Sequence, residues 1–534
     1  MPKLILLCLI VFLSVSSKAQ NLVYSAAVGN YPYAHAQIIG SVKNNIIIYH
    51  QNWSPPFDVR NSEILVYDDD MHLLKTTSFS SIVPKLCSVD FSKQGDSFSA
   101  IVQFVENGNF VCKLVSFDAN GNILGTQILE HSADIGAGKY ELIRSSKGES
   151  FALLRIALAE MNGAIALQYH FVKNGSLVRS DKILIPFDTL SSGLGRVLLD
   201  DDNLILPVND TANGEKLTLF KIDLTNNSSI NTIRNLGHGH LILPGLRINE
   251  NNQYYMVTSQ WKTGAESADA DPRIFLWQLN KDLTDISADT VISNIDSSNP
   301  CLQNLYHYQL NSIAFNDRTS NLIISAGYVT SGNGNYFSRP GSYTGSTYNS
   351  SPYQGVSSPP AGSFYEGRVT SFMPIKEFNG NSSDTWANVV HGPTWSNYTG
   401  GSGNSANYGL LPGKIKAQPP TLAILNIDSQ NNLNWTQCFS DGLEENFKSL
   451  VNESAFLNTK NALHIIYLKS VPKKKQALGE IVLHPDGQYE MKPVIAMNIK
   501  YKYLLPESLQ ISERELIIPC TINDKLAFAK LTID

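Results

Sequence analysis

The chain has 534 residues, of which 16% are charged, and its formal net charge at pH 7 is −6. This sparse, slightly acidic set of charges excludes the clustered Lys and Arg surface of a nucleic-acid-binding protein. The length alone would allow two to four domains, so the repeat pattern must decide between several domains and one large array.

The first residues have the composition of a secretory signal peptide. Lys3 precedes an apolar run from Leu4 to Val15, and the small residues after it end at Ala19. The run is shorter than the ~20 residues that a membrane-spanning helix needs, and no later stretch reaches that length. We predict a signal peptide over 1–19 and an exported chain without a transmembrane segment. It would lie in the periplasm, at the outer membrane or outside the cell; an uncleaved anchor is the alternative.

Five cysteines follow the leader, at Cys87, Cys112, Cys301, Cys438 and Cys520. Their spacing matches no metal site, and free cysteines often pack as small apolar residues in a large core. Cys301 with Cys438 is the one pair that we consider for a disulfide bond.

The stretch from Asn109 to Leu129 predicts a β-hairpin. Apolar residues alternate up to Phe117, and Asp118 to Asn122 has the composition of a tight turn before a second strand. The same cadence recurs at Asp68, Asp118, Lys173, Asp223, Asn280, Asp428, His484 and Asp534. By subtraction the intervals are 50, 55, 50, 57, 148, 56 and 50 residues. Periods of ~40–50 residues made of short strands are typical of β-propeller blades.

Another hairpin precedes each of these turns, which gives four strands per repeat. These hairpins lie at 36–52, 87–105, 141–158, 196–210, 246–261, 311–329, 455–471 and 509–524. The last repeat lacks an outer strand, whereas Asn21 to Val28 is a spare one. We therefore predict an all-β, eight-bladed β-propeller over 20–534, closed by pairing of this N-terminal strand with Leu526 to Thr532.

The interval of 148 residues contains a long insertion in the sixth blade. Residues 331–420 are rich in Gly, Ser and Tyr, and only RVTSFMPI (368–375) has the pattern of a strand. Long loops of this kind are often functional. A ninth blade is the competing interpretation.

Strand direction alternates in a blade, so the loops between second and third strands lie on the same face of the ring as the connections between blades. We call this the loop face. Binding residues concentrate in such loops. The residues that we expect to bind a ligand there are Tyr33, Trp53, Arg60, His238, His240, Trp261, Arg273, Tyr306 and His307.

Two metal-like patterns have simpler explanations. Gly237 to His240 offers two imidazoles without a placed carboxylate partner, which favours a plain connection between blades. The Asp-rich turns at Asp68 and Asp118 lack the remaining ligands of a calcium loop, so they are better explained as hairpin turns. We expect no metal site.

Three outer hairpins carry a resemblance to a repeat class. IDSQNNLNWTQCF (427–439), FDANGNILGTQIL (117–129) and LHPDGQYEMKPVI (483–495) resemble repeats of secreted bacterial β-propeller proteins, and Lys18 to Gln20 resembles the signal-peptide junction of Bacteroidota. The repeats are also distantly similar to those of quinoprotein propellers. The tryptophan of that pattern occurs once, at Trp435, so we expect neither a quinone nor another cofactor.

These observations favour a non-catalytic exported scaffold. It would bind an envelope protein or a glycan through its loop face and insertion, as part of a cell-envelope assembly. The alternative is a polysaccharide-acting hydrolase or lyase with its active site on the same face. No catalytic motif such as G-x-S-x-G or H-E-x-x-H occurs.

Overall fold

The computed structural model describes a chain built almost entirely of strands. The residues it describes are 21–30, 34–54, 58–78, 87–133, 140–145, 149–158, 164–186, 192–194, 197–210, 216–235, 240–248, 251–261, 273–286, 290–292, 308–315, 321–328, 373–374, 421–440, 454–471, 475–496 and 500–533. Within these residues, no helix has both the length and the apolar composition to cross a membrane. The predicted signal peptide lies outside them.

The described strands form eight antiparallel sheets, numbered 1 to 8 here in chain order. Sheet 1 contains β3 (Ala34–Val42), β4 (Asn45–Ser54), β5 (Asp58–Tyr67) and β6 (Leu73–Ser78). Sheet 2 contains β7 (Cys87–Gln94), β8 (Ser97–Glu106), β9 (Asn109–Asp118) and β10 (Ile123–Ser132). Sheet 3 contains β11 (Glu141–Arg144), β12 (Ser150–Leu158), β13 (Ala164–Lys173) and β14 (Ser176–Pro186). Sheet 4 contains β15 (Ser192–Leu194), β16 (Leu198–Asp200), β17 (Asn203–Asp210), β18 (Lys216–Asp223), β19 (Ser228–Asn235) and β26 (Met373–Pro374).

The second half of the chain repeats this plan. Sheet 5 contains β20 (His240–Ile248), β21 (Tyr254–Trp261), β22 (Arg273–Leu279) and β23 (Thr290–Ile292). Sheet 6 contains β24 (Tyr308–Phe315), β25 (Leu322–Tyr328), β27 (Thr421–Ile427) and β28 (Leu433–Ser440). Sheet 7 contains β29 (Ser454–Asn458), β30 (Leu463–Val471), β31 (Lys475–Leu483) and β32 (Tyr489–Ala496). Sheet 8 contains β33 (Tyr501–Tyr503), β34 (Leu509–Ser512), β35 (Glu515–Ile522), β36 (Lys525–Thr532), β1 (Asn21–Tyr24) and β2 (Val28–Asn30), with the short 3₁₀ helix η6 (Leu505–Glu507) after β33.

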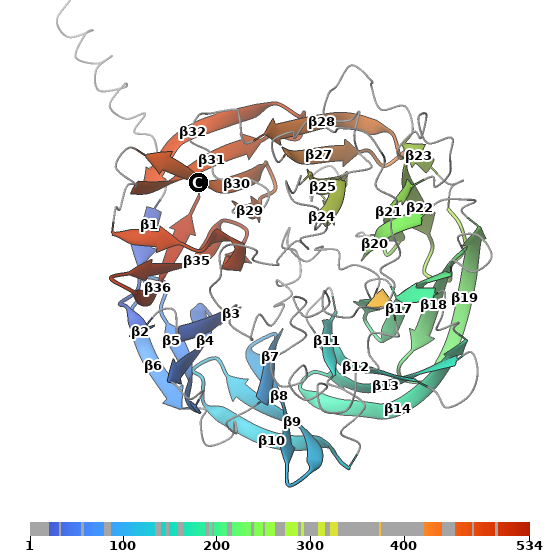
Figure 1. Ribbon diagram of the computed structural model, residues 1–534, viewed down its shortest axis with the longest axis horizontal. Coiled ribbons are helices and arrows are strands. Elements are labelled where there is room, and N and C mark those ends of the chain that lie inside the picture. The colour runs from blue at the N-terminus through green and yellow to red at the C-terminus, as the bar shows by residue number, and fades with distance from the viewer. Residues whose placement is uncertain are drawn as a thin grey trace, which may run out of the picture.

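Figure 1 shows the sheets arranged around a ring, with β3, β7, β20 and β29 toward the centre and β6, β10, β23 and β32 at the rim. The apolar core lies between neighbouring sheets. Ile64 and Val66 of sheet 1, for example, pack with Val115 and Phe117 of sheet 2, and a similar cluster joins sheet 8 to sheet 1. Strands buried on both faces in this way explain the apolar second strand of each predicted hairpin. The fold is a β-propeller, as the repeat pattern predicted.

The N-terminal strand closes sheet 8, as predicted. β1 pairs with β36 from Asn21 opposite Thr532 to Tyr24 opposite Ala529, and β2 continues along the same strand. Tyr24 also stacks on Tyr501 at 4.1 Å between ring centroids, and its hydroxyl lies 2.6 Å from that of Tyr503. Residues from the two ends of the chain therefore complete one sheet.

Five of the outer hairpins share one turn conformation. In the turn of sheet 2, the amide of Asp118 donates to Asn122 O and the amide of Gly121 donates to Asp118 O. The carboxylate of Asp118 accepts hydrogen bonds from the amides of Asn120 and Asn122. The same backbone pattern recurs at Asp68, Asn280, Asp428 and His484. The fourth residue has a positive φ in each case: 60° at Met71, 69° at Gly121, 65° at Leu283, 65° at Asn431 and 85° at Gly487. This is the three-residue hairpin loop with a bulge, which confirms the prediction of hairpin turns at Asp68 and Asp118.

Each of several outer turns is held by the preceding sheet. Asn45 Nδ2 of sheet 1 donates to Ala119 O in the turn of sheet 2 at 3.0 Å. Arg179 Nη1 of sheet 3 donates to Thr225 O of sheet 4 at 2.6 Å. Lys530 of sheet 8, which is 4% exposed, donates to Asp69 Oδ1 of sheet 1 at 2.5 Å and to Glu515 Oε1 at 3.0 Å. Because this last contact joins the final sheet to the first, it closes the ring a second time.

The long insertion connects adjacent strands of sheet 6. β25 ends at Tyr328, β27 begins at Thr421, and the two strands pair along their length. Within the predicted strand 368–375, Met373 and Pro374 form β26, which pairs with Leu194 and Gly193 of β15 in sheet 4. The rest of the insertion lies outside the described residues.

Candidate functional site

Three of the residues expected on the loop face come together at one end of sheet 5. His240 is the first residue of β20 and Trp261 the last of β21, and the two are directly paired. Arg273 begins β22 and pairs with Gln260, next to Trp261. All three positions lie at the end of the sheet opposite to the outer turn at Asn280.

Trp53 and Arg60 lie in strands, whereas the sequence analysis expected both in a loop between strands. β4 continues through Ser54, β5 begins at Asp58, and Asn52 pairs with Asn61. The prediction of a loop was wrong because Asn52 and Asn61, whose polar side chains suggested the end of the hairpin, are paired in the ladder. Tyr33, His238, Tyr306 and His307 lie outside the described residues.

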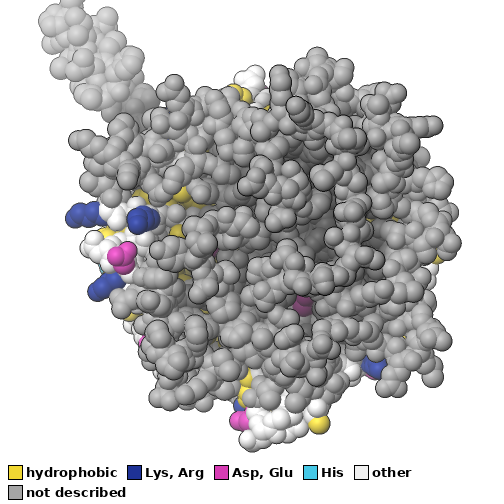
Figure 2. Space-filling view, viewed as in Figure 1, with side chains coloured by type: hydrophobic (Ala, Val, Ile, Leu, Met, Phe, Trp, Pro, Cys, Tyr) yellow, Lys and Arg dark blue, Asp and Glu magenta, His cyan; other side chains and the backbone are white. Residues whose placement is uncertain are grey.

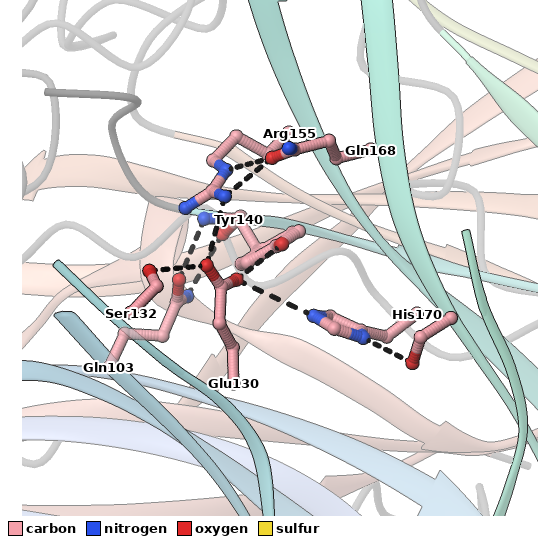
Figure 3. A network of polar contacts seen from close by, with 8 residues as sticks. Gln103, Glu130, Ser132, Tyr140, Arg155, Gln168 and His170 are labelled. Carbon is pink, nitrogen blue, oxygen red and sulfur yellow. Dashed lines mark hydrogen bonds and ion pairs between the residues drawn. The ribbon is translucent and has the colours of Figure 1, made fainter. Parts of the chain in front are cut away.

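A network of polar side chains that the sequence did not predict lies between sheets 2 and 3 (Figure 3). At its centre is Glu130, two residues before the end of β10. Its Oε1 accepts hydrogen bonds from Arg155 Nη2 at 3.0 Å and Ser132 Oγ at 2.7 Å. Its Oε2 accepts one from the hydroxyl of Tyr140 at 2.5 Å and lies 3.7 Å from His170 Nε2. Glu130 therefore contacts Arg155 and His170 of sheet 3, and also Tyr140, which directly precedes the first strand of that sheet.

Further contacts fix each partner of Glu130. Gln168 Oε1 accepts a hydrogen bond from Arg155 Nε at 2.8 Å, and Ser180 Oγ lies 2.7 Å from His170 Nδ1. The guanidinium of Arg155 lies over the Tyr140 ring, 4.6 Å from its centroid. Gln103 exchanges two hydrogen bonds with the backbone of Tyr140, at 2.9 and 2.7 Å. Figure 3 shows these side chains pointing toward one another across the seam between the sheets.

The network keeps Glu130 ionised. Burial by itself raises the pKa of the Glu130 carboxyl, but the nearby His170 imidazole, hydrogen bonds from Tyr140 and Ser132 and the charge of Arg155 outweigh this and lower the pKa to about 2. A carboxylate with so low a pKa does not act as a general acid near neutral pH. The arrangement is suited to holding two sheets together.

A smaller cluster of charged side chains in sheet 7 also has its partners within the fold. In sheet 7, Glu480 is fully buried, with its Oε1 2.6 Å from His464 Nδ1 and its Oε2 3.8 Å from Lys492 Nζ. Among the described residues, no three His, Cys, Asp or Glu side chains are grouped so that they could hold a metal ion.

The carboxyl of Glu507 differs from that of Glu130, because its pKa is raised and not lowered. Glu507, in η6 of sheet 8, is an exposed residue, yet desolvation by the protein atoms around its carboxyl raises its pKa to about 7. Its backbone amide donates to Leu504 O, and the described residues place no second carboxylate in contact with it.

On the face shown in Figure 2, several exposed cationic side chains lie near sheet 8. Lys502 and Lys525 are exposed there. Lys502 pairs with Thr521, whereas Lys525 pairs with the adjacent Ile522, so the two lysines point to opposite faces of the sheet. They do not form a single cationic site.

The cysteines differ in state. Cys112 and Cys520 are free and buried, and burial raises the pKa of both thiols. Cys438 is disulfide-bonded. Its partner lies outside the described residues, so the pairing with Cys301 stays a prediction.

The sequence contains a signal for the charged residues of these networks: a charge within an apolar run. Arg155, Glu480 and Lys530 each interrupt the apolar part of a strand, in FALLRIAL, ALGEIVL and LAFAKLT. A lone charge that such a strand buries must be paired. The partner is not readable from the strand itself, because it belongs to another strand or to the neighbouring sheet.

The fold places the chain among β-propeller proteins. No protein-family model matches its sequence, and neither does any curated protein. Oligopeptidase B from Leishmania major is similar in structure at 9% identity and a TM-score of 0.40, over 93% of this chain and 54% of that one. The chain thus spans about half the length of that peptidase.

Two further solved structures are similar at this level. One is the β-propeller domain of the Trilobed protease from Pyrococcus furiosus, at 8% identity and a TM-score of 0.35, over 84% of this chain and 98% of that one. The other is an apocarotenoid oxygenase from Synechocystis, at 10% identity and a TM-score of 0.28, over 52% and 64%. Likenesses this distant carry no argument about activity.

Proposed function

We propose that this chain is an exported, non-catalytic β-propeller scaffold that binds an envelope protein or a glycan through its loop face and insertion. The observation that carries the proposal is the convergence of His240, Trp261 and Arg273 at one end of sheet 5. Aromatic, imidazole and cationic residues at the end of one sheet are the residue types that suit a sugar or the side chains of a protein partner. The Glu130 network, by contrast, is occupied in joining two sheets.

Export is supported by two separate observations. The leader has the composition of a signal peptide, and Cys438 is disulfide-bonded. Structural disulfides persist in oxidising compartments and are rare in the cytosol. The N-terminal sequence of the purified exported protein, determined by Edman degradation, tests the cleavage after Ala19.

We further propose that each of the eight sheets is one blade of the ring, and that the insertion belongs to the sixth. The recurrent outer turn and the contacts from one sheet to the turn of the next support this count. So does the uninterrupted pairing of β25 with β27 on either side of the insertion. An experimental structure in which two of the sheets share one blade position would overturn it.

The test of the proposed binding is a pull-down from envelope fractions with the tagged protein, run beside a glycan array. Capture of one envelope protein or one glycan class, competed by untagged protein, is expected. If neither experiment gives a competed signal, the scaffold proposal fails.

The raised pKa of Glu507 favours a second function, the polysaccharide-acting enzyme. A carboxyl with a pKa of about 7 has the protonation state of a general acid near neutral pH, but glycoside hydrolysis usually needs a second carboxylate within about 5–10 Å. Release of reducing ends from a polysaccharide panel, lost in Glu507→Gln and kept in Glu513→Gln, would establish this function in place of the scaffold.

A further inference from the structure

The disulfide of Cys438 lies in a strand that has a neighbour on one side only. β28 is the outermost strand of sheet 6 and pairs with β27, with Cys438 opposite Ala423. Among the described residues no strand covers its other edge. The ladder with β27 holds one edge of this strand, so side-chain contacts must provide its other attachments to the ring.

The same strand holds the outer turn of sheet 7. Trp435 Nε1 donates to Pro485 O at 2.8 Å, and Gln437 Nε2 donates to Gly487 O at 2.7 Å. The Trp435 ring lies directly on Gly487, since a Cβ at this glycine would be 2.7 Å from Trp435 Cγ. We call this set of contacts, from Trp435 and Gln437 to Pro485 and Gly487, the β28 latch.

The disulfide and the latch lie on opposite faces of one strand. Trp435 and Gln437 share a face because side chains alternate along a strand, and Cys438 follows Gln437 on the other face. A covalent tether on the face turned away from sheet 7 therefore fixes the position from which the latch residues reach the turn. Cys438 is the only cysteine of β28, so its disulfide is the only covalent link that can join this strand to a distant part of the chain.

We propose that the Cys438 disulfide holds the β28 latch closed, so that the seam between sheets 6 and 7 becomes fully ordered only in an oxidising compartment. Closing the tether joins two thiols in one S–S bond and passes two electrons and two protons to a disulfide oxidant, such as an oxidised thiol oxidoreductase. A dithiol reductant reverses the step: the S–S bond breaks, two thiols form, and the reductant is oxidised to its cyclic disulfide. The inference does not depend on the partner proposed above.

Hydrogen–deuterium exchange of the folded, exported protein tests it, with and without dithiothreitol. On reduction, the amides of 433–440 and 485–488 are expected to exchange about tenfold faster, while those of the equivalent turn at 117–123 keep their rates. The buried free thiols provide the matched control: Cys112→Ser should leave the β28 latch unchanged, whereas Cys438→Ser should reproduce the effect of the reductant.

Three results would overturn the proposal. One is a free thiol at Cys438 in the untreated protein, found by alkylation and mass spectrometry. Another is unchanged exchange at the latch after complete reduction. The third is an equal acceleration in every sheet, which would mean that the disulfide stabilises the whole ring. If Cys438→Ser does not fold, reduction of the folded wild-type protein still separates these outcomes.

Discussion

The carboxylate of Glu130 in sheet 2 lies 3.0 Å from the guanidinium Nη2 of Arg155 in sheet 3. Arg155 is 3% exposed, so the pair joins two sheets where water screens the charges little. Removing one member of such a pair leaves the other charge buried without its partner, which is strongly destabilising. The seam between sheets 2 and 3 thus depends on an ionised Glu130.

Stability should fall in acid because of this residue. The pKa of Glu130 is about 2 in the folded protein and 4.5 is its ordinary value, so its contribution is complete above pH 4.5 and is lost as the pH falls toward 2. The difference corresponds to roughly 3 kcal/mol of unfolding free energy. Urea denaturation between pH 7 and pH 2.5 measures it. Glu130→Gln should be less stable at pH 7 and flatten the acid limb, and the exposed Glu490→Gln should do neither. Equal pH profiles for wild type and Glu130→Gln would contradict this account.

The contact between Trp435 and Gly487 makes a sharper mutational prediction. Gly487 has a φ of 85°, and an added Cβ would lie 2.7 Å from the indole. Gly487→Ala should lower the free energy of unfolding by about 2–4 kcal/mol, through left-handed strain and overpacking together. In a Trp435→Ala background only the strain of about 1–2 kcal/mol should remain. A double-mutant cycle by chemical denaturation measures the difference. Additive effects of the two substitutions would show that the ring does not restrain Gly487.

Removal of the N-terminal strand should open sheet 8. Deleting Asn21 to Val28 from the exported chain removes the ladder with β36 and the contacts of Tyr24 with Tyr501 and Tyr503. The melting temperature should drop by many degrees because a long edge of β36 is exposed. Tyr24→Phe, which keeps the stacked ring and loses only the 2.6 Å hydroxyl contact, is the control and should have a small effect. An unchanged melting temperature in the deletion would mean that β1 does not stabilise the ring.

The sequence predicts the elements whose cause is local. The hairpin at Asn109 to Leu129 and its turn at Asp118 depend on alternation and on turn chemistry within a few residues, and both were predicted correctly. The closing strand was predictable because a spare strand and a missing one balanced each other.

Contacts between blades were not predictable in this way. Arg155 meets Glu130, and Trp435 meets Pro485, across a seam whose geometry depends on the twist and spacing of whole sheets. The candidate binding residues illustrate the same limit. Pairing of His240 with Trp261 follows from the hairpin, whereas Trp53 was assigned to a loop because polar residues in its strand concealed the continuing ladder.

The insertion should be dispensable for folding. Sheet 6 pairs β25 with β27 in register without it, and its one described strand, β26, adds two residue pairs to sheet 4. Replacing residues 331–420 by a short Gly/Ser linker should leave a cooperative unfolding transition, since loop length changes the closure entropy slowly. Differential scanning calorimetry checks this, with circular dichroism as a control for strand content. Failure of the excised chain to fold would mean that the segment contributes a blade.

Substitution of Trp53 or Trp261 by alanine should weaken binding much more than it lowers the stability of the protein. Both lie at strand ends on the loop face, at the ends of β4 and β21, in sheets 1 and 5. Large aromatic side chains in such positions usually dominate the free energy of binding. Alanine at each site should reduce capture of the envelope protein or glycan at least tenfold, or about 1.4 kcal/mol, with little change in melting temperature. Tyr489→Ala removes an exposed aromatic beside the opposite, turn-bearing end of sheet 7 and is the matched control. A large loss of stability in Trp53→Ala and Trp261→Ala, with undiminished binding by the molecules that remain folded, would mean that these rings support the fold and do not contact a partner.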